Sequence, residues 1–557
     1  MNILEINNLT LKLTGNQKIL VDNLSFNLEK NTILGILGES GSGKSLTAFS
    51  ITKLLPPAIE ISSGRILFND GKDIINLAAL TNKELKKIRG GKISIIFQEP
   101  MTSFNPRIKL GKQVDEVLEI HKPELKPKDR KQKTLQLFTE VGISEPERIY
   151  KSYPFEVSGG QKQRVMIAMA LAAQPSIVIA DEPTTAIDIT VQRKIINLLL
   201  KLKETHDLSI IFISHDIGVL ANISDKLLVM YKGKKVEEGT VNQILHNPSS
   251  AYTKGLIACR PPIKSRPERL PVVSDYLQGI ETQYPEKEIN KSHILSSPQI
   301  LNIKNLTVSY PEKGSFLSKA KRNTVLKDIT LDIYQGETLG LVGESGSGKT
   351  TLGRTILKLI EPDSGDILYN GKSILTFSGK ELKKYRKEVQ LIFQDPFSSL
   401  NPRLTIGETI MEPMIVHKLY MRKETIAQTK TLMEQVGLPS SFFDRYPHEL
   451  SGGQRQRVVI ARSLAVKPKL IICDESVSAL DVSLQAQILN LLNDLKDEFN
   501  LTYIFISHDI AVIKYFSDRI AVMRNGKIEE TGFSDDIYFN PQSEYTANLW
   551  KSVYEIT

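Results

Sequence analysis

The sequence predicts an α/β protein built from two similar domains in tandem. Short apolar runs such as "TILGIL" and "SIIFIS" alternate with longer helical patterns such as "VQRKIINLLLKLKE", which is typical of a buried sheet covered by helices. Several stretches of the first half return in the second half: "GESGSGKSLT" as "GESGSGKTTL", "IIFQEPMTSFNPR" as "LIFQDPFSSLNPR", "VSGGQKQRVMIAMALA" as "LSGGQRQRVVIARSLA" and "FISHDIGVL" as "FISHDIAVI". A repeat of this extent indicates a duplicated domain.

The spacing of the repeated motifs supports duplication of a whole domain. Lys44 and Lys349 lie 305 positions apart, and His215 and His508 lie 293 positions apart. Most of this change falls between the glycine-rich loop and the following glutamine motif, and surface loops tolerate such differences in length.

The region between the two copies predicts a linker. It is rich in proline and charge and poor in periodic hydrophobicity, as in "RPPIKSRPERLPVVSDYLQG". We expect one domain over residues 1–260, a linker over 261–297 and a second domain over 298–557.

The composition excludes several classes of protein. A hydrophobic content of 41% and a charged content of 24% are those of a globular protein. We find no apolar run of membrane-spanning length and no signal peptide, which predicts a cytoplasmic chain. Two cysteines cannot form a disulfide framework. The net charge of +9 is spread along the chain, and its basic runs lack interleaved aromatic residues, so we expect no nucleic-acid partner.

The glycine-rich motif G-x-x-x-x-G-K-[ST] occurs once in each copy, after an apolar strand and before a helical pattern. Its glycines let backbone amides surround phosphate oxygens, and Lys44 or Lys349 can reach the β- and γ-phosphates. The hydroxyl groups of Ser45 and Thr350 suit Mg²⁺. These observations predict two nucleotide-binding sites.

Each copy also carries two carboxylates at the end of an apolar strand, in "IVIADE" and "LIICDE". Downstream of a phosphate-binding loop, Asp181 and Asp474 suit the coordination shell of Mg²⁺. Glu182 and Glu475 suit the orientation or deprotonation of an attacking water molecule.

With the "SGGQ" motifs added, the chain resembles the ATP-binding subunit of an ABC transporter with two nucleotide-binding domains fused in one polypeptide. The resemblance covers nearly the whole chain. It implies for each domain a RecA-like core, an antiparallel β subdomain and a helical subdomain. It also implies that the two domains pair within the chain, so that ATP on the loop of one domain is closed over by the signature of the other.

The resemblance assigns site residues by position. The expected ATP contacts of the loops are Gly38, Glu39, Ser40, Gly41, Ser42, Gly43, Lys44, Ser45 and Leu46, and Gly343, Glu344, Ser345, Gly346, Ser347, Gly348, Lys349, Thr350 and Thr351, with Tyr310 available to stack on adenine. Those of the signatures are Ser158, Gly159, Gly160 and Gln161, and Ser451, Gly452, Gly453 and Gln454. The expected catalytic residues are Glu182, His215 and Gln98, and Glu475, His508 and Gln394. The expected Mg²⁺ ligands are Ser45, Gln98 and Asp181, and Thr350, Gln394 and Asp474.

The glutamine motifs and two further segments, "NPSSAYTKGL" (247–256) and "NPQSEYTANL" (540–549), are similar to those of peptide and nickel importer ATPases. This similarity implies ATPase activity that energises import of peptides or related solutes. It also implies two separate permease subunits and an extracytoplasmic solute-binding protein as partners, and a peripheral location on the cytoplasmic face of the plasma membrane. The sequence does not identify the solute.

Two other functions stay open from the sequence. A translation factor of the ABC class also has two such domains on one chain, although its long charged helical hairpin between the domains has no counterpart in the proline-broken segment here. A non-hydrolysing ATP-binding regulator is the second alternative, and the retention of Glu182 and Glu475 argues against it.

Overall fold

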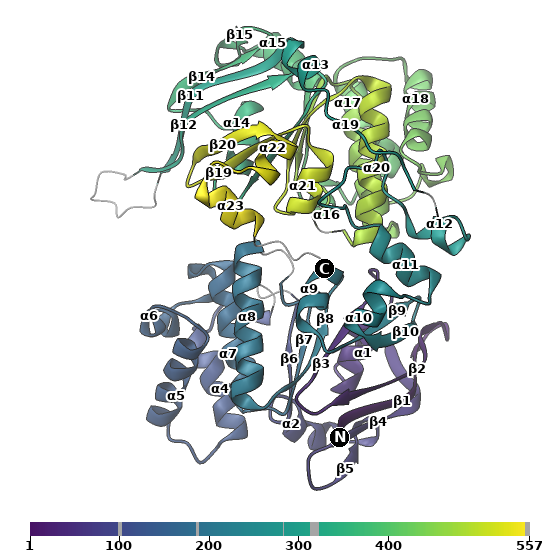
Figure 1. Ribbon diagram of the computed structural model, residues 1–557, viewed down its shortest axis with the longest axis vertical. Helices are drawn as coiled ribbons and strands as arrows, with labels where there is room; N and C mark the ends of the chain where they lie inside the picture. The colour runs from purple at the N-terminus through teal and green to yellow at the C-terminus, as the bar shows by residue number, and fades with distance from the viewer. Residues whose placement is uncertain (99–102, 185–188, 282, 312–321, 479, 552–557) are drawn as a thin grey trace. The chain divides into compact units, whose positions relative to one another are not determined.

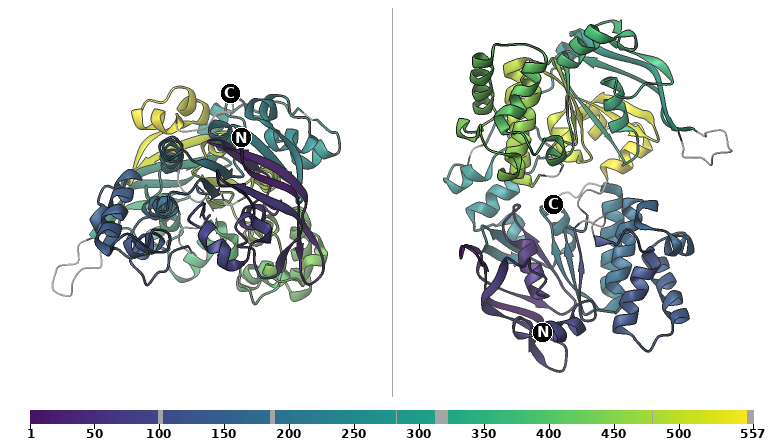
Figure 2. Two further views of the ribbon diagram at one scale, coloured as in Figure 1. Left: turned by 90° about the horizontal axis from the view of Figure 1, so that it is seen from below. Right: turned by 180° about the vertical axis from the view of Figure 1, so that it is seen from behind.

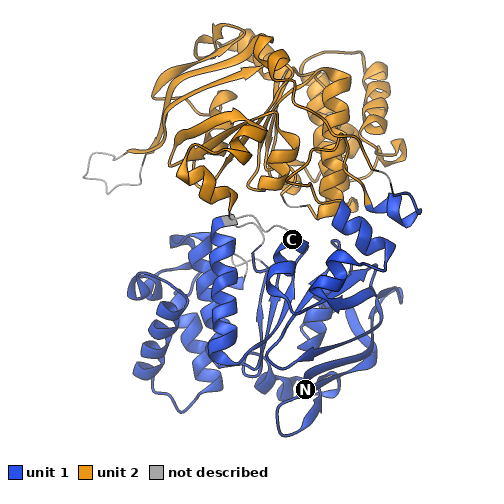
Figure 3. Ribbon diagram, viewed as in Figure 1, with its two compact units in different colours: residues 1–258, 273–281, 554–557 blue, residues 259–272, 282–553 orange. Residues whose placement is uncertain are grey.

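A computed structural model describes residues 1–98, 103–184, 189–281, 283–311, 322–478 and 480–551. The chain divides into two compact units (Figure 3). Unit 1 contains Met1–Ala258 and Val273–Glu281, and unit 2 contains Cys259–Val272 and Thr282–Val553. Within the described residues, no helix combines the length and apolarity that a membrane span requires.

Each unit contains a six-stranded sheet whose central strands are buried. In unit 1 the order is β10 (Lys234–Thr240), β9 (Lys226–Tyr231), β3 (Ile33–Leu37), β8 (Ser209–Ile213), β7 (Ile177–Asp181) and β6 (Ile93–Ile96). In unit 2 it is β20 (Lys527–Phe533), β19 (Arg519–Arg524), β13 (Thr338–Gly343), β18 (Thr502–Ile506), β17 (Leu470–Asp474) and β16 (Val389–Ile392). Only the first pair in each order is antiparallel. All residues of β3, β7 and β8 are buried, which explains their continuous apolar sequences.

A four-stranded antiparallel sheet packs against the core in each unit. In unit 1 its order is β2 (Ile19–Glu29), β1 (Asn2–Leu13), β4 (Ile59–Asn69) and β5 (Ile74–Asn76). In unit 2 it is β12 (Arg322–Tyr334), β11 (Gln299–Pro311), β14 (Ser364–Tyr369) and β15 (Lys372–Ser373). In each unit one hydrophobic cluster joins this sheet, the six-stranded sheet and the helix that follows the glycine-rich loop.

Helices surround the six-stranded sheet of each unit (Figure 1). Those of unit 1 are α1 (Lys44–Ile51), α2 (Asn82–Ile88), α4 (Leu110–His121), α5 (Pro127–Glu140), α6 (Pro146–Lys151), α7 (Gly159–Leu171), α8 (Ile189–His206), α9 (Ile217–Ile223), α10 (Val241–His246), α11 (Ala251–Ala258) and α12 (Val273–Leu277). Those of unit 2 are α13 (Lys291–Ser296), α14 (Lys349–Ile356), α15 (Gly379–Glu388), α16 (Pro396–Ser399), α17 (Ile406–Val416), α18 (Arg422–Gln435), α19 (Gly452–Leu464), α20 (Val482–Phe499), α21 (Ile510–Phe516), α22 (Ser534–Phe539) and α23 (Glu544–Trp550).

One group of helices forms a separate subdomain in each unit. Helices α4, α5, α6 and α7 contact one another in unit 1, and α17, α18 and α19 do so in unit 2. Within each unit, this group and the antiparallel sheet lie on opposite sides of the six-stranded sheet (Figure 2). The predicted fold of core, antiparallel β subdomain and helical subdomain is therefore confirmed for both copies.

The part of the inter-cassette segment that belongs to unit 2, Cys259–Val272, is hydrogen-bonded to helices of that unit. The buried Asn490 of α20 pairs with the main chain of Leu270: its Oδ1 accepts the Leu270 N–H at 2.9 Å, and its Nδ2 donates to the Leu270 carbonyl at 2.8 Å. The guanidinium of buried Arg266 donates to the Lys514 carbonyl at 2.7 Å. The segment thus contains buried main chain with specific partners.

We expect Asn490→Ala to destabilise unit 2 by about 1 to 3 kcal/mol, because it leaves two buried main-chain groups of Leu270 unpaired. Trp550, the single tryptophan of the chain, is buried in unit 2, so its fluorescence in a denaturant titration reports the unfolding of that unit. The control is Asp494→Asn, which breaks the exposed Arg269–Asp494 ion pair and should change stability by less than about 1 kcal/mol. Equal effects of the two variants would contradict this prediction.

Candidate active site

The glycine-rich loop of each unit joins a buried strand to the start of a helix. Gly41 and Gly43 have φ angles of 80° and 98°, and Gly346 and Gly348 have angles of 80° and 106°. Residues with a Cβ avoid this left-handed region, which explains the glycines. Helices α1 and α14 begin directly after the loops without a side-chain cap, so amides at the positive end of each helix are available to an anion.

The lysine that ends each loop is buried and bonds to the loop itself. Lys44 is 5% exposed, and its Nζ donates to the carbonyls of Gly38 at 2.7 Å and Glu39 at 2.9 Å. Lys349 repeats this arrangement with the carbonyls of its own loop at 2.7 and 3.0 Å. The ammonium is thus positioned at the centre of the loop.

The hydroxyl after each lysine bonds to the aspartate at the end of a strand. Ser45 Oγ donates to Asp181 Oδ1 at 2.9 Å, and Thr350 Oγ1 donates to Asp474 Oδ1 at 3.1 Å. Burial raises the pKa of Asp181 to about 6, although the Ser45 hydrogen bond opposes this shift. A hydroxyl beside a buried carboxylate is an oxygen pair of the kind that Mg²⁺ prefers.

The predicted catalytic glutamates follow the same strands and bond to the predicted glutamine and histidine. Glu182 Oε2 accepts from Gln98 Nε2 at 3.0 Å and lies 3.3 Å from His215 Nδ1. Glu475 Oε2 accepts from Gln394 Nε2 at 2.7 Å and lies 3.5 Å from His508 Nδ1. The structure therefore brings the three predicted catalytic residues of each copy together.

Opposing effects set the pKa values in this cluster. Burial lowers the pKa of His215, whereas the hydrogen bond to Glu182 and the charge of Glu182 raise it. The raising effects together are larger, so the pKa of His215 lies above its ordinary value. The same effects raise the pKa of His508. Burial raises the pKa of Glu475, yet its hydrogen bond to His508 and the charge of His508 leave it below its ordinary value. The carboxylate of Glu475 is therefore ionised at neutral pH.

The two signatures lie at the starts of α7 and α19. Ser158 Oγ accepts the Gln161 amide, and Gln161 Oε1 accepts the Ser158 amide, which forms a capping box. Ser451 and Gln454 form the same box. A Cβ added at Gly159 or Gly452 would meet no atom within 4 Å inside the chain, so both helix starts are open to a ligand.

The structure also shows where the predicted contact residues Tyr310, Thr351 and Leu46 lie. Tyr310 is 39% exposed on β11, and its Oη lies 3.5 Å from Thr351 Oγ1. Leu46 packs its side chain against the hydrophobic core, which leaves its main chain to serve a ligand.

Two residues that reach the loops were not predicted as site residues. The Glu39 amide donates to Tyr252 Oη at 3.1 Å, and the Glu344 amide donates to Tyr545 Oη at 3.4 Å. The signal available in the sequence was the repetition of "NPSSAYTKGL" as "NPQSEYTANL", which places a tyrosine at corresponding positions.

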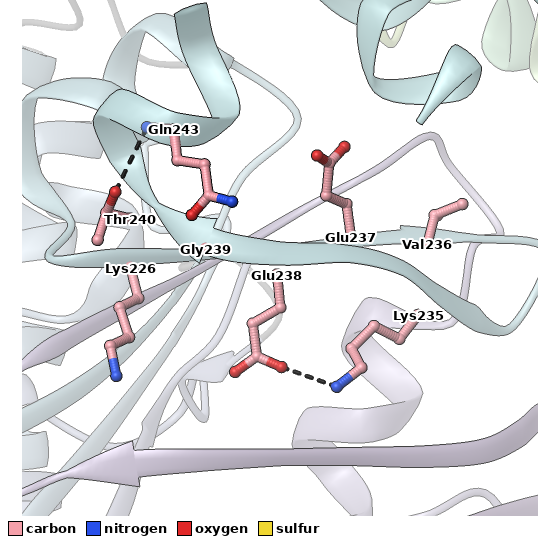
Figure 4. Close-up of a pocket in the computed structure, with 8 residues that line it drawn as sticks. All are labelled: Lys226, Lys235, Val236, Glu237, Glu238, Gly239, Thr240 and Gln243. Atoms are coloured by element: carbon pink, nitrogen blue, oxygen red, sulfur yellow. Dashed lines mark hydrogen bonds and ion pairs between the residues drawn. The ribbon is translucent and has the colours of Figure 1, made fainter. Parts of the chain in front are cut away.

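A pocket of about 580 Å³ lies elsewhere in unit 1, beside β9, β10 and α10 (Figure 4). It is lined by Lys226, Lys235, Val236, Glu237, Glu238, Gly239, Thr240 and Gln243. None of these is a predicted site residue, so this pocket is separate from the clusters described above.

Each unit has the geometry of an ATP-binding cassette. Carboxylate, amide and imidazole groups converge beside a phosphate-binding loop, and a separate helix begins with the capped "SGGQ" signature. Residues 21–185 and 326–478 match the ABC transporter family. Residues 236–284 match the C-terminal region of oligopeptide/dipeptide transporters.

Full-length relatives and solved structures give further matches. The glutathione import ATP-binding protein GsiA of Escherichia coli O157:H7 is 42% identical over 565 residues, which cover 99% of this chain and 89% of that protein. The GsiA proteins of Shigella boydii serotype 4 (strain Sb227) and Escherichia coli (strain K12) match with the same values. A dimeric structure of the ATP-binding cassette MJ0796 bound to ADP and Pi is 31% identical, with a TM-score of 0.38, and covers 42% of this chain and 98% of that chain.

The chain belongs to the ABC transporter family. It is an ATP-binding, ATP-hydrolysing subunit of the peptide type with two cassettes in one polypeptide, as the sequence predicted. The translation factor and the non-hydrolysing regulator are thereby set aside.

We expect Glu182→Gln to lower the pKa of His215. Glutamine keeps the size of the side chain but removes its charge, so the effect of burial, which lowers the pKa, becomes dominant. Histidine NMR titrations between about pH 5 and 8 measure this change, with the signal assigned through His215→Gln. Because protonated His215 stabilises the native unit through Glu182, that contribution to stability is present at low pH and is lost as the pH rises through the native pKa.

The matched control for this titration is Glu475→Gln, which should shift His508 and leave His215 unchanged. An unaltered His215 titration in Glu182→Gln would show that the carboxylate does not set the protonation of the imidazole.

Proposed function

We propose that the chain forms two composite ATP sites, each closed by residues of both cassettes. The first site contains Lys44, Ser45, Gln98, Asp181, Glu182 and His215 with Ser451, Gly452 and Gly453. The second contains Lys349, Thr350, Gln394, Asp474, Glu475 and His508 with Ser158, Gly159 and Gly160. The observation that carries the two ATP sites is the glutamine–glutamate–histidine cluster, which occurs in both units beside a complete phosphate-binding loop. Closure of each site by the opposite signature rests on the family resemblance and is supported by the open helix starts at Gly159 and Gly452.

Each residue type has a chemical role in this proposal. Glu182 and Glu475 orient the attacking water and accept its proton, and the ionised state of Glu475 suits this role. His215 and His508 contact the γ-phosphate, and Lys44 and Lys349 stabilise its charge. The Ser45–Asp181 and Thr350–Asp474 pairs, with Gln98 and Gln394, would hold Mg²⁺, which neutralises phosphate charge when bound.

We further propose that hydrolysis energises import of peptides through two separate permease subunits, supplied by an extracytoplasmic solute-binding protein. The chain would then bind at the cytoplasmic face of the plasma membrane. Support comes from the oligopeptide/dipeptide transporter region and from the full-length similarity to proteins named for glutathione import. Glutathione is a small peptide, so both similarities favour a peptide substrate.

An apolar hollow in unit 1 is suited to receive an apolar side chain from a helix of the permease. This hollow of about 180 Å³ is lined mainly by apolar groups, among them Leu54, Ile95, Phe97 and Val117. It lies between the strand that leads to Gln98 and helices α4 and α7. A side chain inserted there would contact the strand next to the catalytic glutamine.

We expect Glu182→Gln and Glu475→Gln together to reduce ATP turnover by roughly 100- to 1,000-fold and to retain ATP binding. The substitution removes the proton-accepting charge and keeps the hydrogen bond to the glutamine. Phosphate release measures turnover, and a fluorescent ATP analogue measures binding. Glu145→Gln, at an exposed ion pair with Arg148, is the control and should leave both unchanged. Undiminished turnover in the double variant would refute the assignment of these glutamates.

The transport proposal is tested by affinity purification of the tagged full chain from solubilised native membranes, with bound chains identified by mass spectrometry. We expect two permeases, and a solute-binding protein when the complex is stabilised by crosslinking. A purification that yields no permease would overturn the proposal.

A further inference from the structure

The tail motif of each cassette places a tyrosine hydroxyl on the glycine-rich loop. Tyr252 lies on α11 and is 1% exposed, and its Oη accepts the Glu39 amide at 3.1 Å. Tyr545 lies on α23, and its Oη accepts the Glu344 amide at 3.4 Å. Each tyrosine is more than 200 residues from its loop in the sequence. The contact therefore joins the end of each cassette to its phosphate-binding loop.

The tyrosine and the loop lysine hold opposite edges of the same peptide group. In a trans peptide the carbonyl of one residue and the amide of the next point in opposite directions. The Gly38 carbonyl accepts from Lys44 Nζ at 2.7 Å, while the Glu39 amide of that peptide donates to Tyr252. The Gly343–Glu344 peptide has the same two partners in unit 2. Hydrogen bonds at both edges fix the plane of the peptide.

The tyrosine of unit 1 is itself held in place by its surroundings. Its ring stacks on Tyr231 with centroids 4.2 Å apart, and its amide donates to Ser250 Oγ at 3.2 Å. The carboxylate of Glu237 accepts the amides of Ser249 and Ser250 at 2.7 and 3.2 Å. Figure 4 shows Glu237 projecting from β10 on the face opposite Glu238. A strand carboxylate therefore anchors the turn that presents Tyr252.

Unit 2 builds the same support from partly different residues. Glu530 on β20 accepts the amides of Gln542 and Ser543 at 2.8 and 3.1 Å, and Ser543 Oγ accepts the Tyr545 amide at 3.2 Å. Arg524 occupies the position of Tyr231, and its guanidinium lies 4.7 Å from the centroid of the Tyr545 ring. Stacking is thus replaced by a cation–π contact, while the bond from the tyrosine to the loop is retained.

We propose that Tyr252 and Tyr545 are positioning residues that keep the two ATP-binding loops in their phosphate-accepting shape. This rests on the proposed function of the loops. When Lys44 leaves the loop carbonyls for phosphate, the Tyr252 hydroxyl retains the Gly38–Glu39 peptide in its orientation. The region shared with oligopeptide/dipeptide transporters, residues 236–284, contains both Glu237 and Tyr252. The first part of that region therefore acts on ATP affinity from within the cassette.

The test measures ATP affinity at one site of the full chain. Lys349→Ala removes binding at the second loop, and Tyr252→Phe is added to this variant. We expect the Kd for a fluorescent ATP analogue to rise about 3- to 10-fold, because one hydrogen bond that preorganises the loop is lost while the ring stack is kept. The kcat of the otherwise native Tyr252→Phe chain at saturating ATP should stay unchanged. The melting temperature should fall by no more than about 2 to 4 °C, the shift expected from the loss of one hydrogen bond. Hydrogen exchange at the Glu39 amide should accelerate.

Tyr231→Phe is the matched control, since it removes a hydroxyl from the other ring of the same stack. Equal Kd values for the Tyr252→Phe and Tyr231→Phe chains would overturn the proposal, as would a larger fall in melting temperature accompanied by equal losses in kcat and affinity. Lys44→Ala with Lys349→Ala separates this result from failure of the proposed function. If that double variant binds ATP normally, the loops are not the ATP sites and both proposals fall. If it loses binding and Tyr252→Phe has no effect, only the role of the tyrosine falls.

Discussion

Each glycine-rich loop depends on a buried lysine ammonium that must have oxygen partners. Lys44 and Lys349 are 5% and 6% exposed and lie at the first position of a helix, where the helix dipole disfavours a cation. A buried charge is costly unless it is paired and hydrogen-bonded. The loop supplies two of its own carbonyls, those of Gly38 and Glu39, and its glycines at positions 41 and 43 adopt left-handed conformations as the chain turns back to the lysine. Phosphate oxygens are stronger acceptors for the same ammonium, so the loop carbonyls and phosphate are alternative partners of one lysine.

The duplication provides two independent versions of this arrangement within one chain. The lysine bonds, the hydroxyl–aspartate pair and the glutamine–glutamate–histidine cluster recur with distances that differ by a few tenths of an ångström. The supports around them vary more, as Tyr231 in one unit and Arg524 in the other show. The groups that face the nucleotide in the proposed function are thus kept, whereas the packing behind them has been rebuilt. This contrast is expected when function restricts the positions of the groups at the site more tightly than the identity of the residues that support them.

The sequence predicted the parts of the site that depend on local order. A glycine-rich segment between an apolar strand and a helix has few alternative conformations, so Lys44 and Ser45 could be placed from spacing alone, and Asp181 and Glu182 from their position at a strand end. The convergence of Gln98 and His215 on Glu182 required the resemblance to a family, because each residue comes from a different strand end. The repeated tail motif marked Tyr252 but not its partner, so its bond to the loop was not predictable, and neither was the pairing of Leu270 with Asn490. Each of these contacts joins segments more than 200 residues apart. The high proline and charge content of the inter-cassette segment predicted an exposed linker, although the segment contains a buried residue, Leu270.

The described hydrogen bonds satisfy the reactive groups of each cassette internally. Lys44 is bound by its own loop, Ser45 is bound by Asp181, and Glu182 is bound by Gln98 and His215. On the proposed assignment, ATP must replace the partners of the lysine, Mg²⁺ those of the serine and aspartate, and water one partner of the glutamate. Each replacement exchanges one set of polar contacts for another, so its net free energy is small compared with the strength of the individual bonds. In the proposed composite sites, binding energy that is not consumed in these exchanges would be available for closure, and a glutamate held by its neighbours until then would limit hydrolysis that is not coupled to closure.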